Sequence, residues 1–295
     1  MKFKILFFSL LIGIRFSLSA QVLEETTELL RIDYAKSTLL TRFSPPDGYK
    51  WIDEEQGSFG EFLVNFPLYP KDFPVRDYNT VPVERQDSHA SLLKIDVGGK
   101  DLQQCADAWI RLYAEYQWKK GDFEEIIFQF TSGQYLSWLD YSKGIRTKEV
   151  GERVHFYSTS KVDSSRENFR NYLNLVFNYA GTISLEREGI RVEKNSEIKT
   201  GDYIIKPGSP GHCVIIMGRA KNKAGKMVYL LAESFMPAQD IHLIKNPFSS
   251  KLSPWYELDV NFLQTKTAKY TFKPTLIKRY YSLFPNHKKP LSAQN

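Results

Sequence analysis

Two side chains that are suited to nucleophilic catalysis stand far apart in the sequence, Cys105 and His212. A thiol attacks a carbonyl as the thiolate, and the first turn of a helix is one of the few local settings that stabilise this anion. Asp101, three residues before Gln104, predicts a capped helix that begins at about Leu102 and carries Cys105 in its first turn. The alternative is that Cys105 is a small core residue on the apolar face of this helix.

The same helix start offers hydrogen-bond donors for an oxyanion. Backbone N–H groups of a first helical turn are unpaired, and the side-chain amide of Gln103 or Gln104 would add to them. Trp109, one turn further along, and Gln239 complete the set of residues that we expect to contact the oxyanion or the substrate.

His212 follows the loop Gly-Ser-Pro-Gly at 208–211 and opens an apolar run that is typical of a buried strand. A junction between a loop and a strand suits a catalytic base, because the sheet fixes the backbone while the ring faces a cleft. The alternative is a histidine that is merely hydrogen-bonded at the end of a strand.

A β-hairpin is expected to supply the group that orients the imidazole. A turn centred between Asn222 and Lys223 would pair His212 with Glu233 across the ladder, on the same face of the sheet. A slip of one residue would turn Glu233 to the other face and leave Gln239 or Asp240 for this role. Glu233 as an ordinary solvated charge at a strand end also stays open.

The two cysteines, Cys105 and Cys213, raise the alternative of a disulfide, as their even number suggests for an exported protein. Adjacent residues of a strand point to opposite faces, so Cys213 should point away from Cys105 if His212 faces it. The disulfide and the catalytic pair therefore exclude one another.

The elements that must position these residues follow from hydrophobic periodicity. Helical spacing is found from 102 to 116 and at 166–180, where Gly181 is a stop, and Ser58 begins a smaller capped helix over 58–68. Strands are predicted at 92–97, 126–130, 203–205, 212–217, 227–232 and 270–276, and a polar helix at 24–35. Helices come first and most strands later, which favours an α+β fold in one domain over residues 21–295.

Residues 1–20 are typical of a signal peptide, with Lys2 and Lys4 before an apolar run that ends near small residues. The run is too short for a bilayer-spanning helix, so we expect export to the periplasm or the extracellular space, with no stable membrane insertion after cleavage. The net charge of +6 falls to +3 without Lys2, Lys4 and Arg15. The basic residues are scattered along the sequence, which disfavours nucleic acid as a partner. We expect the protein to be a monomer.

Cofactor chemistry is not expected. His89, His155, His242 and His287 show no spacing that is typical of a metal site, and the sequence has neither a glycine-rich phosphate loop nor a Gly-x-Ser-x-Gly nucleophile elbow. We therefore predict no metal and no cofactor.

The stretch Asp-Leu-Gln-Gln-Cys-Ala-Asp-Ala-Trp at 101–109 resembles the cysteine-bearing helix start of the CHAP-type and NlpC-type papain-like amidases. Gly-Asp-Tyr-Ile-Ile at 201–205 and Gly-His-Cys-Val-Ile-Ile at 211–216 resemble their Gly-Asp and Gly-His strands. The spacing of the two motifs is wider than in these domains, which requires a large insertion, and Gln-Cys-Ala replaces the Asp-Cys-Ser of NlpC-type enzymes. The whole chain also resembles a bacterial secreted family without an established activity.

This resemblance implies a papain-like α+β fold, in which a helix that carries the thiol packs on an antiparallel sheet that carries the imidazole. It assigns Cys105 as the nucleophile, His212 as the base and Glu233 as the polar third residue. The implied activity is hydrolysis of amide bonds in peptidoglycan or another envelope substrate. Two other functions stay open: a non-catalytic binding module on the same fold, and a structural envelope protein with bridged cysteines.

Overall fold

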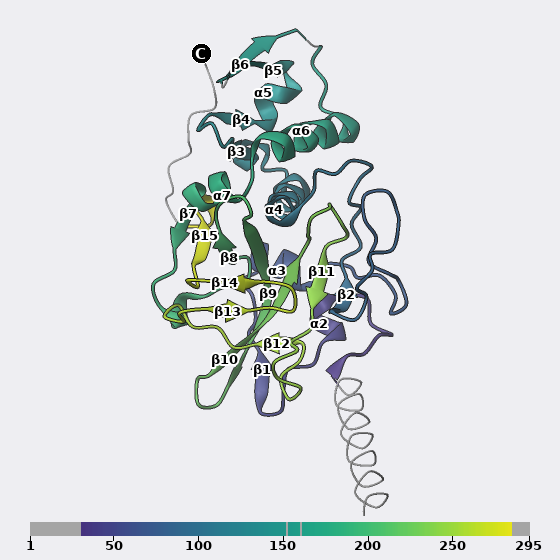
Figure 1. Ribbon diagram of the computed structural model, residues 1–295, viewed down its shortest axis with the longest axis vertical. Coiled ribbons are helices and arrows are strands. Elements are labelled where there is room, and N and C mark those ends of the chain that lie inside the picture. Colours follow the sequence, from purple (N-terminus) through teal and green to yellow (C-terminus); the bar gives the residue numbers. More distant parts are fainter. Residues whose placement is uncertain (1–30, 152, 160, 285–295) are drawn as a thin grey trace, which may run out of the picture.

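The computed structural model describes residues 31–151, 153–159 and 161–284. The predicted signal peptide and most of the predicted helix at 24–35 lie outside these residues. At the centre is a nine-stranded antiparallel sheet, in which the order β2-β11-β10-β9-β8-β15-β7 is joined by β1 on β9 and β12 on β10 (Figure 1).

The strands of this sheet are β1 (Tyr49–Trp51), β2 (His89–Leu92), β7 (Gly189–Arg191), β8 (Tyr203–Lys206), β9 (His212–Asn222), β10 (Met227–Glu233), β11 (His242–Ile244), β12 (Trp255–Tyr256) and β15 (Ile277–Tyr280). Three hairpins stand apart from it: β3 (Ile127–Gln129) with β4 (Tyr135–Ser137), β5 (Ile145–Val150) with β6 (Arg153–Ser158), and β13 (Thr265–Lys266) with β14 (Thr271–Phe272). The α-helices are α2 (Leu39–Arg42), α3 (Phe59–Val64), α4 (Cys105–Lys120), α5 (Trp138–Ser142), α6 (Arg166–Tyr179) and α7 (Thr182–Glu188).

The sheet separates two hydrophobic cores. The larger core holds α4 against alternate β9 residues, among them Ile215 and Met217. The residues between them, Val214 and Ile216, belong to the second core, which also contains Phe272 of the β13–β14 hairpin. Both faces of β9 are therefore buried, which explains its nearly continuous apolar sequence.

Local signals in the sequence account for the helix boundaries. The hydroxyl oxygens of Ser58 and Ser165 accept the backbone N–H of the third residue after them, which caps α3 and α6. Gly121 ends α4 with a φ of 77°, a left-handed conformation that glycine adopts without steric cost. Figure 1 shows α5, α6 and the β5–β6 hairpin together at one end of the molecule, remote from the turn between β9 and β10.

The predicted α+β class with an antiparallel sheet is confirmed, as are the helices at 58–68 and 166–180 and the strands at 203–205, 212–217 and 227–232. Two strand predictions were wrong in position: the first strand of that region is His89–Leu92 rather than 92–97, and of 270–276 only Thr271–Phe272 is in a strand, β14, because β15 begins at Ile277. Within the described ranges no helix is both long and apolar enough to cross a membrane.

Candidate functional site

Cys105 is the first residue of α4, three residues after the predicted helix start. The backbone N–H of Gln104 donates to Asp107 Oδ2 at 3.1 Å, so the helix is capped by this pair. Asp101 lies before the helix instead of capping it: its Oδ1 accepts from Gln104 Nε2 at 3.0 Å and from the N–H of Ala238 at 2.7 Å. These bonds tie the cysteine-bearing turn to the loop that follows β10.

The sulfur of Cys105 lies beside the peptide that joins His212 to Cys213, because the N–H of Cys213 is directed at it. Cys105 is partly exposed, whereas Cys213 is fully buried, and both thiols are free. The structure thus does not contain the disulfide that was the alternative for this pair.

Cys213 was expected to point away from Cys105 if the ring of His212 faced Cys105, and this condition is not met. Both pack in the core on the α4 side of the sheet, whereas the ring of His212 lies on the other side against Phe235, Tyr270 and Phe272. The reason is that α4 begins beside the start of β9, where the Cys105 sulfur lies against the backbone N–H of Cys213. No hydrogen bond joins the sulfur to the imidazole in the part of the chain that the structure describes.

Burial, and to a smaller extent the Asp107 carboxyl, raise the pKa of the Cys105 thiol to about 12, against the effect of the backbone N–H groups of Ala106, Cys213 and Cys105 itself. The expected stabilisation of a thiolate by the helix start is therefore outweighed. Burial also raises the pKa of Asp107 well above its ordinary value. The resting form of Cys105 at neutral pH is the thiol.

His212 and Glu233 form the hydrogen bond that the hairpin argument expected. His212 Nε2 lies 2.9 Å from Glu233 Oε2, and the two side chains are 3% and 0% exposed. An ionised carboxylate only accepts, so Nε2 carries the proton and the neutral ring leaves Nδ1 as a bare acceptor. His212 Nδ1 has no hydrogen-bond partner among the residues described.

Glu233 is ionised in this setting. Burial alone would raise its pKa, but the hydrogen bond from His212 and the nearby ring of His242 lower the pKa to about 2. The carboxylate is therefore a permanent acceptor for the ring of His212 above this pH.

Sequence reasoning missed two residues beside Glu233. His242 pairs directly with Glu233 across the β10–β11 ladder, and its Nε2 lies 3.7 Å from Glu233 Oε1. Lys269, between β13 and β14, places Nζ 3.4 Å from His242 Nε2 and 4.0 Å from Glu233 Oε1. A second hairpin, predicted from the apolar residues after Asp240, would have revealed His242. Lys269 comes close to Glu233 only in the tertiary fold, so no local sequence pattern predicts this contact.

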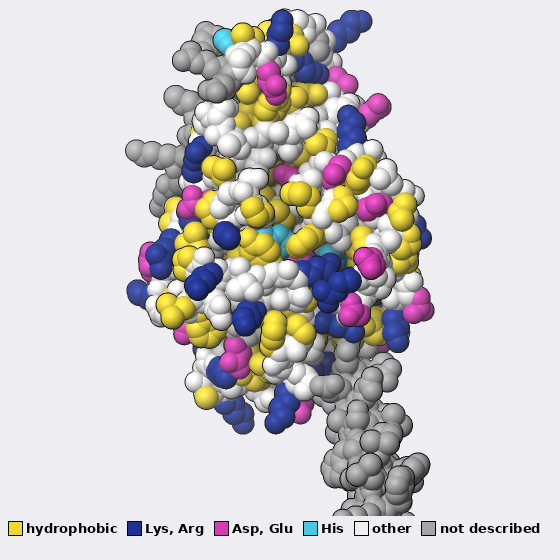
Figure 2. Space-filling model, in the orientation of Figure 1, with side chains coloured by type: hydrophobic (Ala, Val, Ile, Leu, Met, Phe, Trp, Pro, Cys, Tyr) yellow, Lys and Arg dark blue, Asp and Glu magenta, His cyan; other side chains and the backbone are white. Residues whose placement is uncertain are grey.

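Histidine side chains are visible near the centre of the face that the β13–β14 hairpin covers, with hydrophobic side chains around them and Lys and Arg beside them (Figure 2). The aromatic contacts of His212 are close: its ring centroid lies 4.6 Å from that of Tyr270 and 5.0 Å from that of Phe235. Tyr270 and Phe235 are both partly exposed. Beyond Phe235 the exposed Met236 continues this apolar surface.

The predicted oxyanion residues are placed differently. Gln103 is fully buried, and its Oε1 accepts from Arg111 Nη1 at 2.9 Å and from Arg170 Nη1 at 3.3 Å. Its Nε2 is buried and unpaired within the described ranges. Gln104 is partly exposed at the helix start. Between the two candidates, Gln104 is thus the one whose side chain is open to solvent.

Trp109 requires a correction, because it is fully buried and its indole Nε1 donates to Gly201 O at 2.8 Å. Its ring stacks on Tyr113 in the core, which leaves no surface for a substrate. Its role is therefore to anchor α4 to the start of β8.

Gln239 and Asp240 were the alternatives to Glu233, and each has another partner. Gln239 is buried and forms a bridge with Asp77, and its side-chain Nε2 lies 3.5 Å from Pro237 O. Asp240 Oδ2 accepts the backbone N–H of Arg76 at 2.9 Å. Among the described residues, Glu233 alone of the three proposed carboxyl or amide groups bonds to His212.

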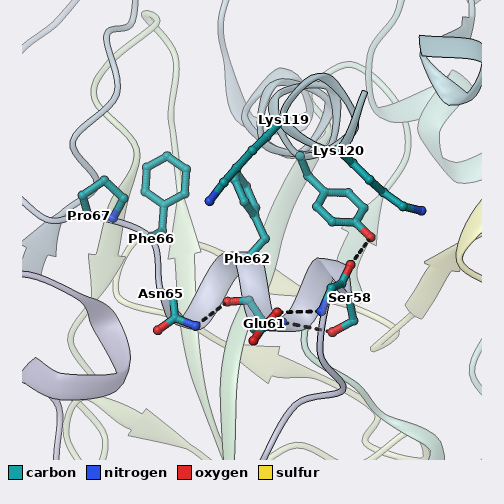
Figure 3. Close-up of a pocket in the computed structure, with 10 residues that line it drawn as sticks. Ser58, Glu61, Phe62, Asn65, Phe66, Pro67, Lys119 and Lys120 are labelled. Carbon is teal, nitrogen blue, oxygen red and sulfur yellow. Dashed lines mark hydrogen bonds between the residues drawn. The ribbon is translucent and has the colours of Figure 1, made fainter. Parts of the chain in front are cut away.

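A pocket of about 450 Å³ lies elsewhere, between α3 and the C-terminal end of α4 (Figure 3). Phe62, Phe66 and Tyr116 form its apolar side, with Lys119 and Lys120 projecting from α4. At 1.5 Å per residue, the length of α4 separates this pocket from Cys105 by roughly 20 Å. It is not part of the histidine cluster. In residues 31–284, apart from 152 and 160, no group of three or more His, Cys, Asp or Glu residues is arranged to hold a metal ion.

The model of one protein family, described as "Domain of unknown function (4846)", matches residues 39–279. This range contains Cys105, His212 and Glu233 together with His242 and Lys269. No curated protein and no solved structure matches the chain.

Proposed function

Since the chain belongs to this family, whose description assigns no activity, its function must be argued from its own residues, and we propose that it is a cysteine hydrolase of amide bonds. The observation that carries the proposal is the buried hydrogen bond of 2.9 Å between His212 and Glu233, with the Cys105 sulfur beside the peptide that follows His212. A nucleophile, a base and a group that orients the base are the three parts that such a site requires.

The raised pKa of Cys105 favours general-base activation over a preformed ion pair. In the proposed reaction, His212 Nδ1 takes the thiol proton while sulfur attacks the carbonyl carbon and the C=O double bond opens to an oxyanion. The C–N bond then breaks, His212 returns the proton to the leaving nitrogen, and a thioester remains on Cys105. Water, deprotonated by His212, then attacks the thioester carbonyl, the C–S bond breaks, and His212 returns the proton to the sulfur, which releases the acid and restores the thiol.

For this reaction the sulfur and Nδ1 must come into contact when a substrate binds. In the structure the two groups lie on opposite sides of β9, so this contact requires the ring of His212 to move toward the start of α4 when the substrate binds. The backbone N–H of Cys213, the N–H groups at the start of α4 and the side chain of Gln104 are the proposed oxyanion donors.

We further propose a papain-like arrangement and a substrate in the cell envelope, such as a peptide of the cell wall. A helix that bears the cysteine on an antiparallel sheet that bears the histidine supports the first proposal. The segment from β3 to α7, which lies between Cys105 and His212 in the sequence, corresponds to the expected insertion. The leader sequence at 1–20 supports export, and the aromatic surface of Phe235 and Tyr270 suits a peptide.

Digestion of purified peptidoglycan by the purified mature chain tests the proposal. We expect release of new amino groups by the wild type and none by Cys105→Ala. Cys213→Ala is the matched control, because its thiol is buried, and it should retain activity. Equal release by the wild type and Cys105→Ala would overturn the proposal.

A binding module on the same fold is the second candidate, and the neutral resting thiol favours it. In that case the wild type and Cys105→Ala would bind the same peptides with equal affinity and release no product from them. Titration calorimetry with soluble cell-wall peptides distinguishes the two functions, because a hydrolase alone converts the titrant to fragments.

A further inference from the structure

The buried carboxylate of Glu233 has one satisfied and one unsatisfied oxygen. Oε2 accepts from His212, whereas Oε1 is buried without a hydrogen bond in the described residues. A buried ionised oxygen without a donor is costly, and burial favours protonation of the carboxyl group. The groups that face Oε1 therefore decide whether Glu233 remains charged.

Protonation of Glu233 would reverse the direction of its hydrogen bond with His212. A neutral carboxyl group donates its proton to Nε2, which leaves the neutral ring of His212 protonated at Nδ1. His212 could then no longer accept a proton from Cys105. The ionised state of Glu233 thus fixes the tautomer that the proposed reaction needs.

His242 alone does not secure this state. Its Nδ1 lies 2.8 Å from Asp240 O, and a nitrogen that bonds to a carbonyl oxygen must be the donor. In the neutral ring Nε2 is consequently bare, and it faces both Lys269 Nζ at 3.4 Å and Glu233 Oε1 at 3.7 Å. A neutral His242 offers an acceptor, not a donor, toward the carboxylate.

Lys269 is the remaining cation. Its side chain is 12% exposed, its Nζ lies 4.0 Å from Glu233 Oε1, and it stands over the ring of Phe235 at 5.6 Å. The ammonium group has three donors, and the contact with His242 uses one of them. A small movement of the Lys269 side chain would bring a second N–H donor within hydrogen-bond distance of Glu233 Oε1.

We propose that Lys269, acting with His242, is a positioning residue that keeps Glu233 ionised and thereby holds His212 in the tautomer with Nδ1 free. This inference rests on the proposed function. The groups that face the cluster from the surrounding elements are His212 of β9, His242 of β11, His89 of β2 and Tyr256 of β12, with Arg85, Asp87 and Lys245 at longer range.

The charge of Glu233 can be measured without activity, from the ¹³C chemical shift of its carboxyl group in the folded protein. In the wild type the group should remain ionised at pH 3.5, whereas in Lys269→Met its midpoint should rise by about one pH unit or more. Lys269→Arg should restore the wild-type behaviour. Lys266→Met, an exposed lysine of the same hairpin, is the matched control and should change nothing.

Enzyme kinetics provide the second measurement. The kcat of Lys269→Met should fall about tenfold with little change in KM, and its loss on the acid side should lie at higher pH than in the wild type. An unchanged ¹³C midpoint in Lys269→Met would overturn the inference even if the wild type hydrolyses amides. A raised midpoint in a protein without hydrolytic activity would leave the inference standing and refute the proposed function. If Lys269→Met does not fold, Lys269→Gln replaces it.

Discussion

Glu233 reaches His212 because a β-bulge lies between Leu230 and Leu231. Before the bulge Leu230 pairs with Gly218, and after it Leu231 pairs with Ile216. Without this irregularity Glu233 would stand level with Ile215 and face the core beneath α4. With it, Glu233 stands level with Val214, on the same face as His212, and bonds to the ring diagonally.

The bulge thus corrects a register that the turn alone would set wrongly. Pairing of Met227 with Lys221 shows that the hairpin turn lies further along than the predicted centre between Asn222 and Lys223. The turn shifts the pairing by three residues and the bulge shifts it back by one, which leaves Glu233 on its predicted face, two residues from its predicted partner.

Replacement of Glu233 measures how much its ionised carboxylate beside His212 contributes to the free energy of unfolding. The depressed pKa of about 2, against an ordinary 4.5, corresponds to a stabilisation of about 3 kcal/mol. Because the folded pKa is the lower one, this stabilisation is present above pH 4.5 and is lost as the pH falls toward 2. Glu233→Gln should therefore lower the free energy of unfolding by about 3 kcal/mol at pH 7, with a gap that narrows below pH 4.5. Urea denaturation across this range measures it, and a gap that stays constant to pH 3 would show that the charge of Glu233 is not the source of the stabilisation.

Alkylation of the cysteines tests the state of the thiol. With a pKa of about 12, the thiolate fraction of Cys105 is small at neutral pH and rises about tenfold per pH unit. In the absence of substrate, the rate of reaction with iodoacetamide should thus rise from pH 7 to pH 9.5 without a plateau. Mass spectrometry should locate the adduct on Cys105 and not on the buried Cys213. A plateau near pH 8 or below would show that a neighbouring group stabilises the thiolate.

The sequence specified much of the fold, because local patterns carry it. The apolar face and the serine cap of α6 and the run from His212 to Met217 follow from periodicity alone. Glu233 was also predicted as the partner of His212, although from a hairpin register that the turn and the bulge together shift by two residues. Local rules accounted for these features because each involves neighbours in one helix or one hairpin.

What the sequence could not show depends on contacts between distant segments. The side of the sheet on which Cys105 packs depends on where α4 meets the start of β9, and the pKa of Cys105 follows from the burial that results. Lys269 reaches Glu233 from a hairpin that is 36 residues further along. Trp109 was predicted to contact the substrate from its position beside the cysteine motif, but a sequence motif does not show whether a side chain is buried, and this one is.

A substitution of Trp109 tests whether this residue serves the core or contacts the substrate. Phenylalanine in its place removes the hydrogen bond to Gly201 O and part of the ring that stacks on Tyr113. Trp109→Phe should destabilise the protein by about 2 kcal/mol, since it leaves a buried carbonyl unpaired and a small cavity. Its KM should remain within about twofold of the wild-type value. Phe235→Ala, which truncates a partly exposed ring beside His212, should raise KM instead. A large rise of KM in Trp109→Phe would return Trp109 to the substrate site.

A second buried carboxyl group, that of Glu188, predicts the opposite pH dependence to Glu233. Burial raises the pKa of Glu188 to about 8, and this effect outweighs hydrogen bonds from the Tyr280 hydroxyl and the backbone of Gln129, which lower the pKa. The Tyr280 hydroxyl lies 2.9 Å from Oε1, whereas Oε2 is buried without a hydrogen bond among the described residues. Glu188 is therefore protonated in the folded protein at neutral pH and ionised in the unfolded chain.

Because the folded pKa is the higher one, stability is fully present below pH 4.5 and declines as the pH rises to about 8. Glu188→Gln, a neutral isostere that can still accept from Tyr280, should remove this decline. We expect the variant and the wild type to unfold at the same temperature at pH 4, and the variant to be more stable by about 4 kcal/mol at pH 8. Calorimetry at the two pH values measures the difference. A variant that is less stable than the wild type at pH 8 would show that Glu188 is held as a carboxylate, and that the Tyr280 hydroxyl, not burial, governs its charge.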